Sequence, residues 1–517
     1  MKKTVFAVLF LAMALLCGTA LAKDEIVLSG GDNAMAGKID PVRGYGVWGP
    51  DIFHCHLLKP GKDNLLEKDL ATDEKVSEDG LRYTYEIRED AKFTDGHPLT
   101  AEDIVFTFES TKAAASVADL SMLESVRALD DRTVEFTLSR PWSFFPHLLS
   151  YVGIVPKHAY KEGYGDMPLG SGAWRIVDFQ IGQQMILEPN PHYYGKKSPF
   201  KRVTILKVDD DATLAAAKSG QLDFVFIPAE FAATKQEVPG MKLLTLDTFT
   251  SLAINLPVIP EGVASGDEKV GNNVTCDPAI RRALNVGISR QLLVDQALSG
   301  MGKPSFTIGG GWLPWASKRT FEDGRLEEAK KILEDAGWVD SDGDGIREKN
   351  GLKAEFTIKG RSNDMPRYNV VVAVAESAKA LGIHIIPQSA PWVEARHARA
   401  TPTCWAFGYP SPSDFYLFYH SSQINKGVIG NPPSYSNPEV DALIDRALRA
   451  TSQEESDRLW QQAEELADAD VPFLYVACPQ DNYLVRDGLT IPPLGRVKSR
   501  NQGGAGLENL NEWSWSE

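Results

Sequence analysis

Residues 404–419, with the sequence CWAFGYPSPSDFYLFY, place aromatic side chains and one acid around a proline-rich turn. Three of the aromatic residues alternate along the chain, so on a strand they share one face. Such a face fits either a buried core or the wall of a ligand pocket. In α/β folds, ligands bind where strands end in turns of this kind. The residues that we assign to a binding site here are Trp405, Phe407, Tyr409, Ser411 and Asp414.

The motifs of common hydrolases are absent from the sequence. It contains neither the GxSxG nucleophile elbow nor the HExxH zinc motif, and its nine histidines are scattered. We therefore predict a binding protein with no catalytic residues and no cofactor.

Two short patterns imitate metal sites. His54-Cys55-His56 lies in a segment, 51–58, that we predict to be helical, where residues two apart point in different directions. Asp340, Asp342 and Asp344 alternate as in a calcium loop, but Gly351 stands where the loop's final acid belongs. A solvated turn is the preferred interpretation of this acidic segment, with calcium binding as the alternative, and we assign no metal ligands.

The chain has 517 residues, enough for more than one domain, with 43% hydrophobic and 24% charged residues. Its formal net charge of −16 argues against nucleic-acid binding, which requires a basic surface. The four cysteines beyond the leader, Cys55, Cys276, Cys404 and Cys478, allow three disulfide pairings or buried thiols, and both remain open.

The N-terminus has the pattern of a secretory leader. Two lysines precede the apolar stretch 5–16, which is too short to span a bilayer, and Ala20-Leu21-Ala22 resembles a cleavage site. Residues 1–22 are therefore predicted to be a signal peptide for export to the periplasm, or to the cell surface without an outer membrane. Leu16 before Cys17 disfavours a lipid anchor.

Strands and helices alternate along the predicted chain, which indicates α/β layers. In the segment 93–110, an Asp95-Gly96 turn precedes Thr100, a candidate helix N-cap with Asp103 three residues later. Strands are predicted at 26–29, 81–88, 132–138, 203–208, 251–256, 352–360, 383–386 and 471–476. Further helices are predicted to start near 277 and to cover 325–337, 368–381 and 454–467.

Several of these stretches resemble, in the right order, signatures of the family 5 extracellular solute-binding proteins, the large peptide- and nickel-binding receptors of ABC importers. The resemblance runs from about residue 37 to 513 and is carried by 38–41 (KIDP), 93–110 (FTDGHPLTAEDIVFTFES), 169–175 (LGSGAWR), 190–195 (NPHYYG), 219–223 (SGQLD) and 277–284 (DPAIRRAL).

The resemblance implies a two-lobed periplasmic-binding-protein fold of type II, with mixed sheets flanked by helices and an extra inserted subdomain. We expect lobe I to comprise 23–50, 170–275 and 479–517, the inserted subdomain 51–169, and lobe II 276–478. The strand 471–476 should run back into lobe I, so that the chain crosses between the lobes twice.

The resemblance also implies a function. A monomeric receptor of this kind captures a small solute, most often a short peptide, and delivers it to an ABC permease in the inner membrane. A nickel or metallophore receptor is the alternative. In peptide-binding members, an aspartate in the turn that matches 408–415 pairs with the ligand's amino group. Ser411 replaces that aspartate and Asp414 falls on the family's asparagine position, so the anchoring acid is either Asp414 or absent.

Other candidate contacts come from outside this turn, and each has ordinary surface or core as its alternative. Tyr45 and Trp48 follow the early KIDP motif, Arg361 follows a predicted strand, Trp392 lies in a turn and Tyr483 follows the return strand. Arg361 could bind a ligand carboxylate with two parallel hydrogen bonds.

Overall fold

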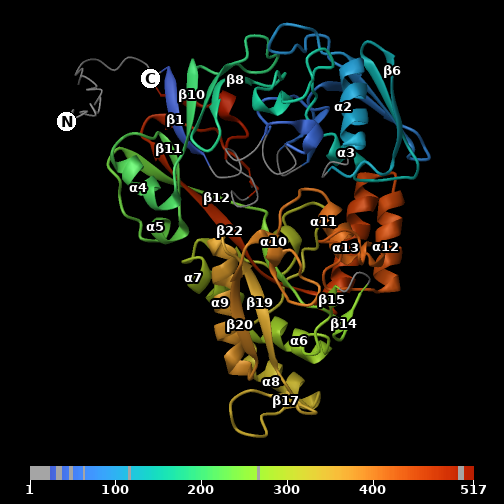
Figure 1. The fold of residues 1–517 in the computed structure, drawn as a ribbon, viewed down its shortest axis with the longest axis vertical. Coiled ribbons are helices and arrows are strands. Elements are labelled where there is room, and N and C mark those ends of the chain that lie inside the picture. The colour runs from blue at the N-terminus through green and yellow to red at the C-terminus, as the bar shows by residue number, and fades with distance from the viewer. Residues whose placement is uncertain are drawn as a thin grey trace, which may run out of the picture.

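The computed structural model describes residues 24–30, 38–45, 51–61, 65–114, 118–264, 268–495, 497–498 and 506–516. Two bodies lie side by side at the top of Figure 1, and a third lies below them. This arrangement agrees with the predicted two-lobed α/β fold, in which one upper body is the inserted subdomain.

The first upper body contains most of a large mixed sheet. Its strands and helices are β1 (Glu25–Gly30), β8 (Trp174–Gln180), β9 (Gln184–Pro189), β10 (Arg202–Lys207), α4 (Asp210–Lys218), β11 (Phe224–Ile227), α5 (Ala229–Ala233), β12 (Met241–Asp247), β23 (Leu489–Thr490), η8 (Leu510–Glu512) and β24 (Ser514–Trp515). Strand β1 pairs in parallel with β10 and β11, whereas β8, β9 and β10 form antiparallel pairs. Its apolar core includes Trp174, Phe224, Tyr483 and Trp513.

The inserted subdomain is built on a four-stranded sheet in the order β4-β5-β7-β6. Its elements, with the short η1 helix that contacts α2, are η1 (Pro41–Arg43), β2 (Leu58–Pro60), β3 (Leu66–Lys68), β4 (Ala71–Val76), β5 (Arg82–Ile87), α2 (Ala101–Ala113), β6 (Leu123–Asp130), β7 (Thr133–Leu138), α3 (Phe145–Leu148) and η3 (Tyr164–Asp166). The predicted N-cap is confirmed, because the Asp103 carboxylate accepts the Thr100 backbone N–H at 2.9 Å.

The lower body is mainly helical. Its strands are β13 (Ser251–Asn255), β14 (Gly262–Val263), β15 (Lys269–Val270), β16 (Gly302–Pro304), β17 (Glu348–Lys349), β18 (Leu352–Lys353), β19 (Glu355–Arg361), β20 (His384–Ala390) and β21 (Cys404–Phe407). Its helices are α6 (Pro278–Gly287), α7 (Arg290–Ala297), η4 (Ile308–Gly311), α8 (Leu326–Asp335), α9 (Met365–Ala378), η5 (Lys379–Leu381), α10 (Trp392–Ala395), α11 (Ser413–Tyr419), η6 (Ser421–Gln423), α12 (Pro438–Arg449) and α13 (Gln453–Asp468).

One long strand, β22 (Phe473–Arg486), joins the upper and lower bodies (Figure 1). Its first half pairs with β13 and β16, and its second half pairs with β11 and β12. The return crossing predicted from 471–476 is therefore confirmed. Strand β13 (251–255) pairs with β21 and β22 and therefore belongs to the lower body. This pairing favours a first passage of the chain between the lobes at 248–250, rather than at the predicted boundary at 275.

The prediction of a helix at 51–58 is wrong. The Asp51 carboxylate accepts the backbone N–H groups of Phe53 and His54 at 2.9 and 3.0 Å, which closes a turn and leaves the chain free to enter β2. The glycine-rich stretch 170–172 packs directly on this turn. A Cβ on Gly170 would lie 2.0 Å from the Phe53 carbonyl oxygen, so only glycine allows the approach.

The four cysteines outside the leader form no disulfide. Cys55, Cys404 and Cys478 are buried, and Cys276 is half-buried. Of the two alternatives left open by the sequence, the structure therefore shows the thiols. Among the described residues, no helix has both the length and the apolar character needed to cross a bilayer.

Candidate functional site

The aromatic face of β21 divides into a core part and an accessible part. Trp405 and Phe407 are buried, and the Trp405 indole donates a hydrogen bond to Asn255 Oδ1 at 2.9 Å. Phe407 packs its ring against Phe418 and Phe473. Of the two alternatives, core or pocket wall, these two residues therefore belong to the core. Tyr409, which follows the strand, is only half-buried.

Asp414 lies in the first turn of α11 with its carboxylate directed back at the 408–412 turn. It accepts the backbone N–H groups of Gly408 and Tyr409 at 3.2 and 3.4 Å. Burial raises the pKa of Asp414 to about 6, although these two N–H groups and the charge of Lys498 act in the opposite direction. Ser411 is also buried, and its hydroxyl lies 2.8 Å from that of Ser413.

Two residues that the sequence analysis missed complete this arrangement. The Lys498 ammonium lies 4.7 Å from the centre of the Tyr409 ring, and burial lowers the pKa of Lys498 to about 8 against the opposing effect of Asp414. Tyr151 packs the edge of its ring on Tyr409 at 6.2 Å. We call Tyr151, Tyr409, Asp414 and Lys498 the Asp414 group.

The Asp414 group draws on three parts of the chain. Tyr151 comes from the inserted subdomain and Asp414 from the lower body. Lys498 belongs to the C-terminal segment, which is tied to the crossing at 248 by a bridge between Thr248 and Val497. A carboxylate, an ammonium and two phenols thus meet where the bodies meet. A lone lysine in an irregular segment has no periodic pattern that could have revealed this contact.

The other predicted contacts lie in separate places. Arg361 stacks its guanidinium over Trp392 at 5.4 Å and donates to Asn363 Oδ1 at 2.8 Å. Trp392 in turn packs edge-on against the buried Trp405 at 5.7 Å, so Arg361 and Trp392 form a half-buried surface that rests on the core of the lower body.

The two predicted first-lobe tyrosines lie apart from that surface. Tyr483 is buried and stacked on Phe224 at 4.4 Å, inside the core of the first upper body. Tyr45 is half-buried near Phe53, and Trp48 lies outside the described residues.

The two metal-like sequence patterns have protein partners of their own. The two ring nitrogens of His54 lie 2.9 Å from Asp51 Oδ2 and from the Tyr164 hydroxyl, and among the described residues His54 belongs to no group of three close metal-ligating side chains. In the acidic turn, the Asp340 carboxylate accepts the backbone N–H groups of Gly343 and Gly345. Lys353 pairs with Asp342 and Asp344, while one carboxylate oxygen each of Asp340, Asp342 and Glu348 lie within 4.8 Å of one another.

Comparison with known proteins gives a consistent result at the sequence level. Residues 66–427 match the family described as bacterial extracellular solute-binding proteins, family 5 middle. Protein XP55 of Streptomyces lividans is 30% identical over 508 residues, which cover 95% of this chain and 90% of that protein. The oligopeptide-binding protein AppA of Bacillus subtilis is 28% identical over 466 residues, which cover 85% and 83% of the two chains.

Solved structures agree with the fold. NikZ from Campylobacter jejuni, in complex with Ni(L-His), superposes with a TM-score of 0.78 at 20% identity, covering 96% of this chain and 100% of that one. Bacillus subtilis AppA, in complex with a nonapeptide, superposes with a TM-score of 0.74 at 24% identity, covering 96% and 99%. Both the sequence match and the two-lobed fold extend over most of the chain, and the chain therefore belongs to the family 5 bacterial extracellular solute-binding proteins, whose members are solute-binding transport proteins.

Proposed function

We propose that this protein is the substrate-binding component of an ABC importer and that it captures a short peptide between its lobes. The observation that carries the proposal is the Asp414 group, which collects polar and aromatic side chains from separate bodies around Tyr409. Ligands of two-lobed receptors are buried where the bodies close on one another. The AppA relative is named as an oligopeptide-binding protein, which supports a peptide as the ligand.

Within this proposal, Tyr409, Ser411 and Asp414 contact the peptide, and Tyr151 and Lys498 join them. Arg361 and Trp392 extend the contact surface along the lower body. Trp405 and Phe407 support this surface from the core of the lower body, and Tyr483 is buried in the core of the first upper body, so none of the three touches the ligand. Tyr45 and Trp48 stay as proposed contacts from the first lobe.

We further propose that a free amino terminus is not the main anchor of the peptide. A buried carboxylate requires a compensating cation, and Lys498 already lies close enough to affect the pKa of Asp414. An incoming ammonium would have to displace Lys498, at the cost of leaving that lysine without its partner. Peptides with free and acetylated amino termini should therefore bind with similar affinity.

The cellular setting is part of the proposal. Residues 1–22 act as a cleaved signal peptide, without a lipid anchor at Cys17, and the mature monomer works in the periplasm beside an inner-membrane permease. Lobe I comprises 23–50, 170–247 and 479–517, the inserted subdomain 51–169, and lobe II 251–478, with the first crossing moved to 248–250 because of the pairing of β13.

Mass spectrometry first identifies any ligand that co-purifies with the protein. Calorimetry on the ligand-stripped protein then tests the proposal. We expect di- to pentapeptides to bind, with and without N-acetylation. Ni²⁺ alone or with histidine should not compete with a bound peptide, because the Asp414 group offers no imidazole nitrogen to coordinate the ion. Binding only of the nickel complex would overturn the peptide proposal.

A variant pair localises the binding event. Tyr409→Ala removes the ring at the centre of the Asp414 group and should weaken peptide binding about tenfold or more, as expected when a central aromatic contact is lost. Tyr193→Ala removes a half-buried ring that packs on Tyr194 in another part of the fold, and should leave the affinity unchanged. Equal affinities for both variants would place the peptide elsewhere.

A further inference from the structure

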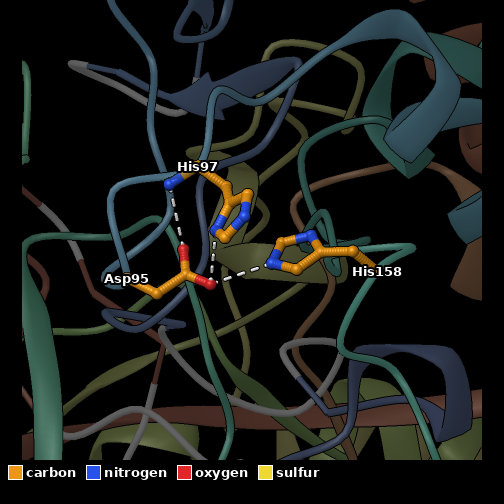
Figure 2. A group of neighbouring side chains, drawn as sticks. All are labelled: Asp95, His97 and His158. Carbon is orange, nitrogen blue, oxygen red and sulfur yellow. Dashed lines mark hydrogen bonds and ion pairs between the residues drawn. The ribbon is translucent and has the colours of Figure 1, made fainter.

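A second group of polar side chains lies on the surface of the inserted subdomain, apart from the Asp414 group. Figure 2 shows Asp95, His97 and His158 directed at one another. Asp95 Oδ2 lies 2.9 Å from His97 Nδ1 and 2.9 Å from His158 Nε2. One ligand atom from each residue lies within 4.8 Å of the other two.

The turn that contains Asp95 and His97 is held rigidly by its own backbone. Lys92 bridges to Pro98, and the Phe93 N–H donates to the His97 carbonyl at 2.9 Å. The His97 N–H donates to Asp95 Oδ1 at 3.0 Å. This last bond occupies one carboxylate oxygen and leaves the other facing the two imidazoles.

His158 reaches the same point from a segment that is fastened to helix α2. The backbone N–H of Val155 donates to the Thr107 hydroxyl at 3.1 Å, and that of Lys157 donates to Asp103 Oδ1 at 2.9 Å. The His158 ring also packs edge-on against Phe93, which is fully buried, at 5.7 Å. The sequence separates His158 from Asp95 by 63 positions, yet both are fixed by the same subdomain.

We propose that Asp95, His97 and His158 form a binding site for a divalent transition metal ion of the zinc class. Two imidazole nitrogens and a carboxylate oxygen are ligands that such ions prefer. The metal replaces the protons now shared between the rings and Asp95, and solvent water completes its coordination. The side chains are 27%, 62% and 36% exposed, so an ion can enter from solution without rearrangement of the fold.

A third imidazole lies near this ligand set. His192 lies beside the turn as well, since its Nε2 would be 3.4 Å from a Cβ on Gly96.

The bound ion would connect the turn at 92–98 to the segment at 155–158. Because an ion that binds only the folded state stabilises it, Zn²⁺ should raise the melting temperature of the protein. This inference does not depend on the peptide proposal, because the site and its readout lie outside the Asp414 group.

The test uses the mature chain without an affinity tag, stripped of metal by a chelator and then titrated with Zn²⁺ by calorimetry. We expect binding to one site and a rise in melting temperature. His97→Ala and His158→Ala should each weaken Zn²⁺ binding at least tenfold and abolish the thermal shift. The melting temperature of each variant without metal verifies that it folds, and both replaced side chains are partly exposed.

His384→Ala is the matched control. His384 is also exposed and pairs with one carboxylate, that of Glu355 at 2.8 Å, but no second imidazole lies beside it in the described contacts. This variant should bind Zn²⁺ like the parent chain. Co²⁺ added to the parent chain should give the visible absorption of a nitrogen- and oxygen-ligated ion. Unchanged Zn²⁺ affinity in His97→Ala and His158→Ala, or no binding by the parent chain, would refute the site.

Discussion

At the scale of single residues, the pair formed by Asp414 and Lys498 is the most consequential feature of the molecule. Removing the Asp414 carboxylate from water is costly, and the attraction of the half-buried Lys498 offsets that cost only in part. The shifts in pKa show the balance, since burial raises the pKa of Asp414 to about 6 and lowers that of Lys498 to about 8. Such a pair fits a site in which charge is held ready for a ligand.

Asp414→Asn should change the pH dependence of stability. The pKa of Asp414 rises from 3.8 to about 6 on folding, so its contribution to stability is present below pH 4 and is lost as the pH rises through 6. A shift of this size corresponds to about 3 kcal/mol in the free energy of unfolding. Urea unfolding between pH 4 and 7 should show that the parent chain loses stability relative to Asp414→Asn over this range.

The difference in unfolding free energy between the parent chain and Asp414→Asn reports on Asp414 alone, because the other buried acids titrate in both proteins. The control is Asp342→Asn, an exposed carboxylate of the acidic turn, for which the difference from the parent chain should not vary in this way. Parallel stability curves for Asp414→Asn and the parent chain would show that the carboxylate is not desolvated as described.

At the scale of elements, helix α13 supports the 408–412 turn, which carries the proposed site. Glu464 is buried on this helix, and its two carboxylate oxygens accept the backbone N–H groups of Ile308 and Ser317, each at 2.7 Å. Within the segment 308–317, Trp315 donates to the Pro410 carbonyl at 3.0 Å. The position of the 408–412 turn is therefore coupled to α13 through this segment.

Glu464→Ala should destabilise the protein strongly. The substitution leaves two buried N–H groups without acceptors, and each unsatisfied group costs about 1–3 kcal/mol. We therefore expect the free energy of unfolding, measured by urea denaturation at pH 5, below the value of about 7 to which burial raises the pKa of Glu464, to fall by about 2 kcal/mol or more. Gln462→Ala, at an exposed position of the same helix, should change it by less than about 0.5 kcal/mol. Similar values for both variants would contradict the role assigned to Glu464.

At the scale of the whole molecule, the inserted subdomain and the lower body contact each other directly. The Ser143 N–H donates to the Leu448 carbonyl at 2.9 Å, and the Ser143 and Ser456 hydroxyls lie 3.0 Å apart. Trp142 packs edge-on against Tyr416 at 5.2 Å. Among the described residues, the chain passes between the lower body and the first upper body at 248–250 and along β22, and we propose that hinge motion at these crossings opens the contact with the inserted subdomain.

Ligand binding should therefore make the molecule more compact. We expect small-angle X-ray scattering to give a smaller radius of gyration with a saturating peptide than without it. Ser456→Arg introduces a bulky charge at the contact with Ser143, so it should keep the protein open and weaken peptide binding about tenfold. Ser125→Arg, at an exposed position of β6, is the control and should behave like the parent chain. An unchanged radius on peptide binding would contradict hinge closure.

The sequence alone determined most of the local structure and the family. Helix α6 begins where Asp277 and Pro278 predict it, because the Asp277 carboxylate accepts the Ala279 N–H and proline needs no partner at a helix start. The alternating pattern at 132–138 became β7, and the glycines at 170–172 allow the close packing expected of them. Each of these features depends on neighbours within a few residues, so the sequence contains the necessary information.

Tertiary structure decided which of these side chains meet. Trp405 and Tyr409 belong to the same aromatic pattern, yet one is buried and the other half-buried, because burial depends on what packs above them. The segment 51–58 failed as a helix because the Asp51 carboxylate bonds locally and distant glycines pack on the turn. Lys498 reaches Tyr409, and His158 reaches Asp95, across sequence distances at which no periodic pattern extends. Such encounters are set by contacts between distant segments, such as the bridge between Thr248 and Val497 and the hydrogen bond from the Lys157 N–H to Asp103, which only the folded chain reveals.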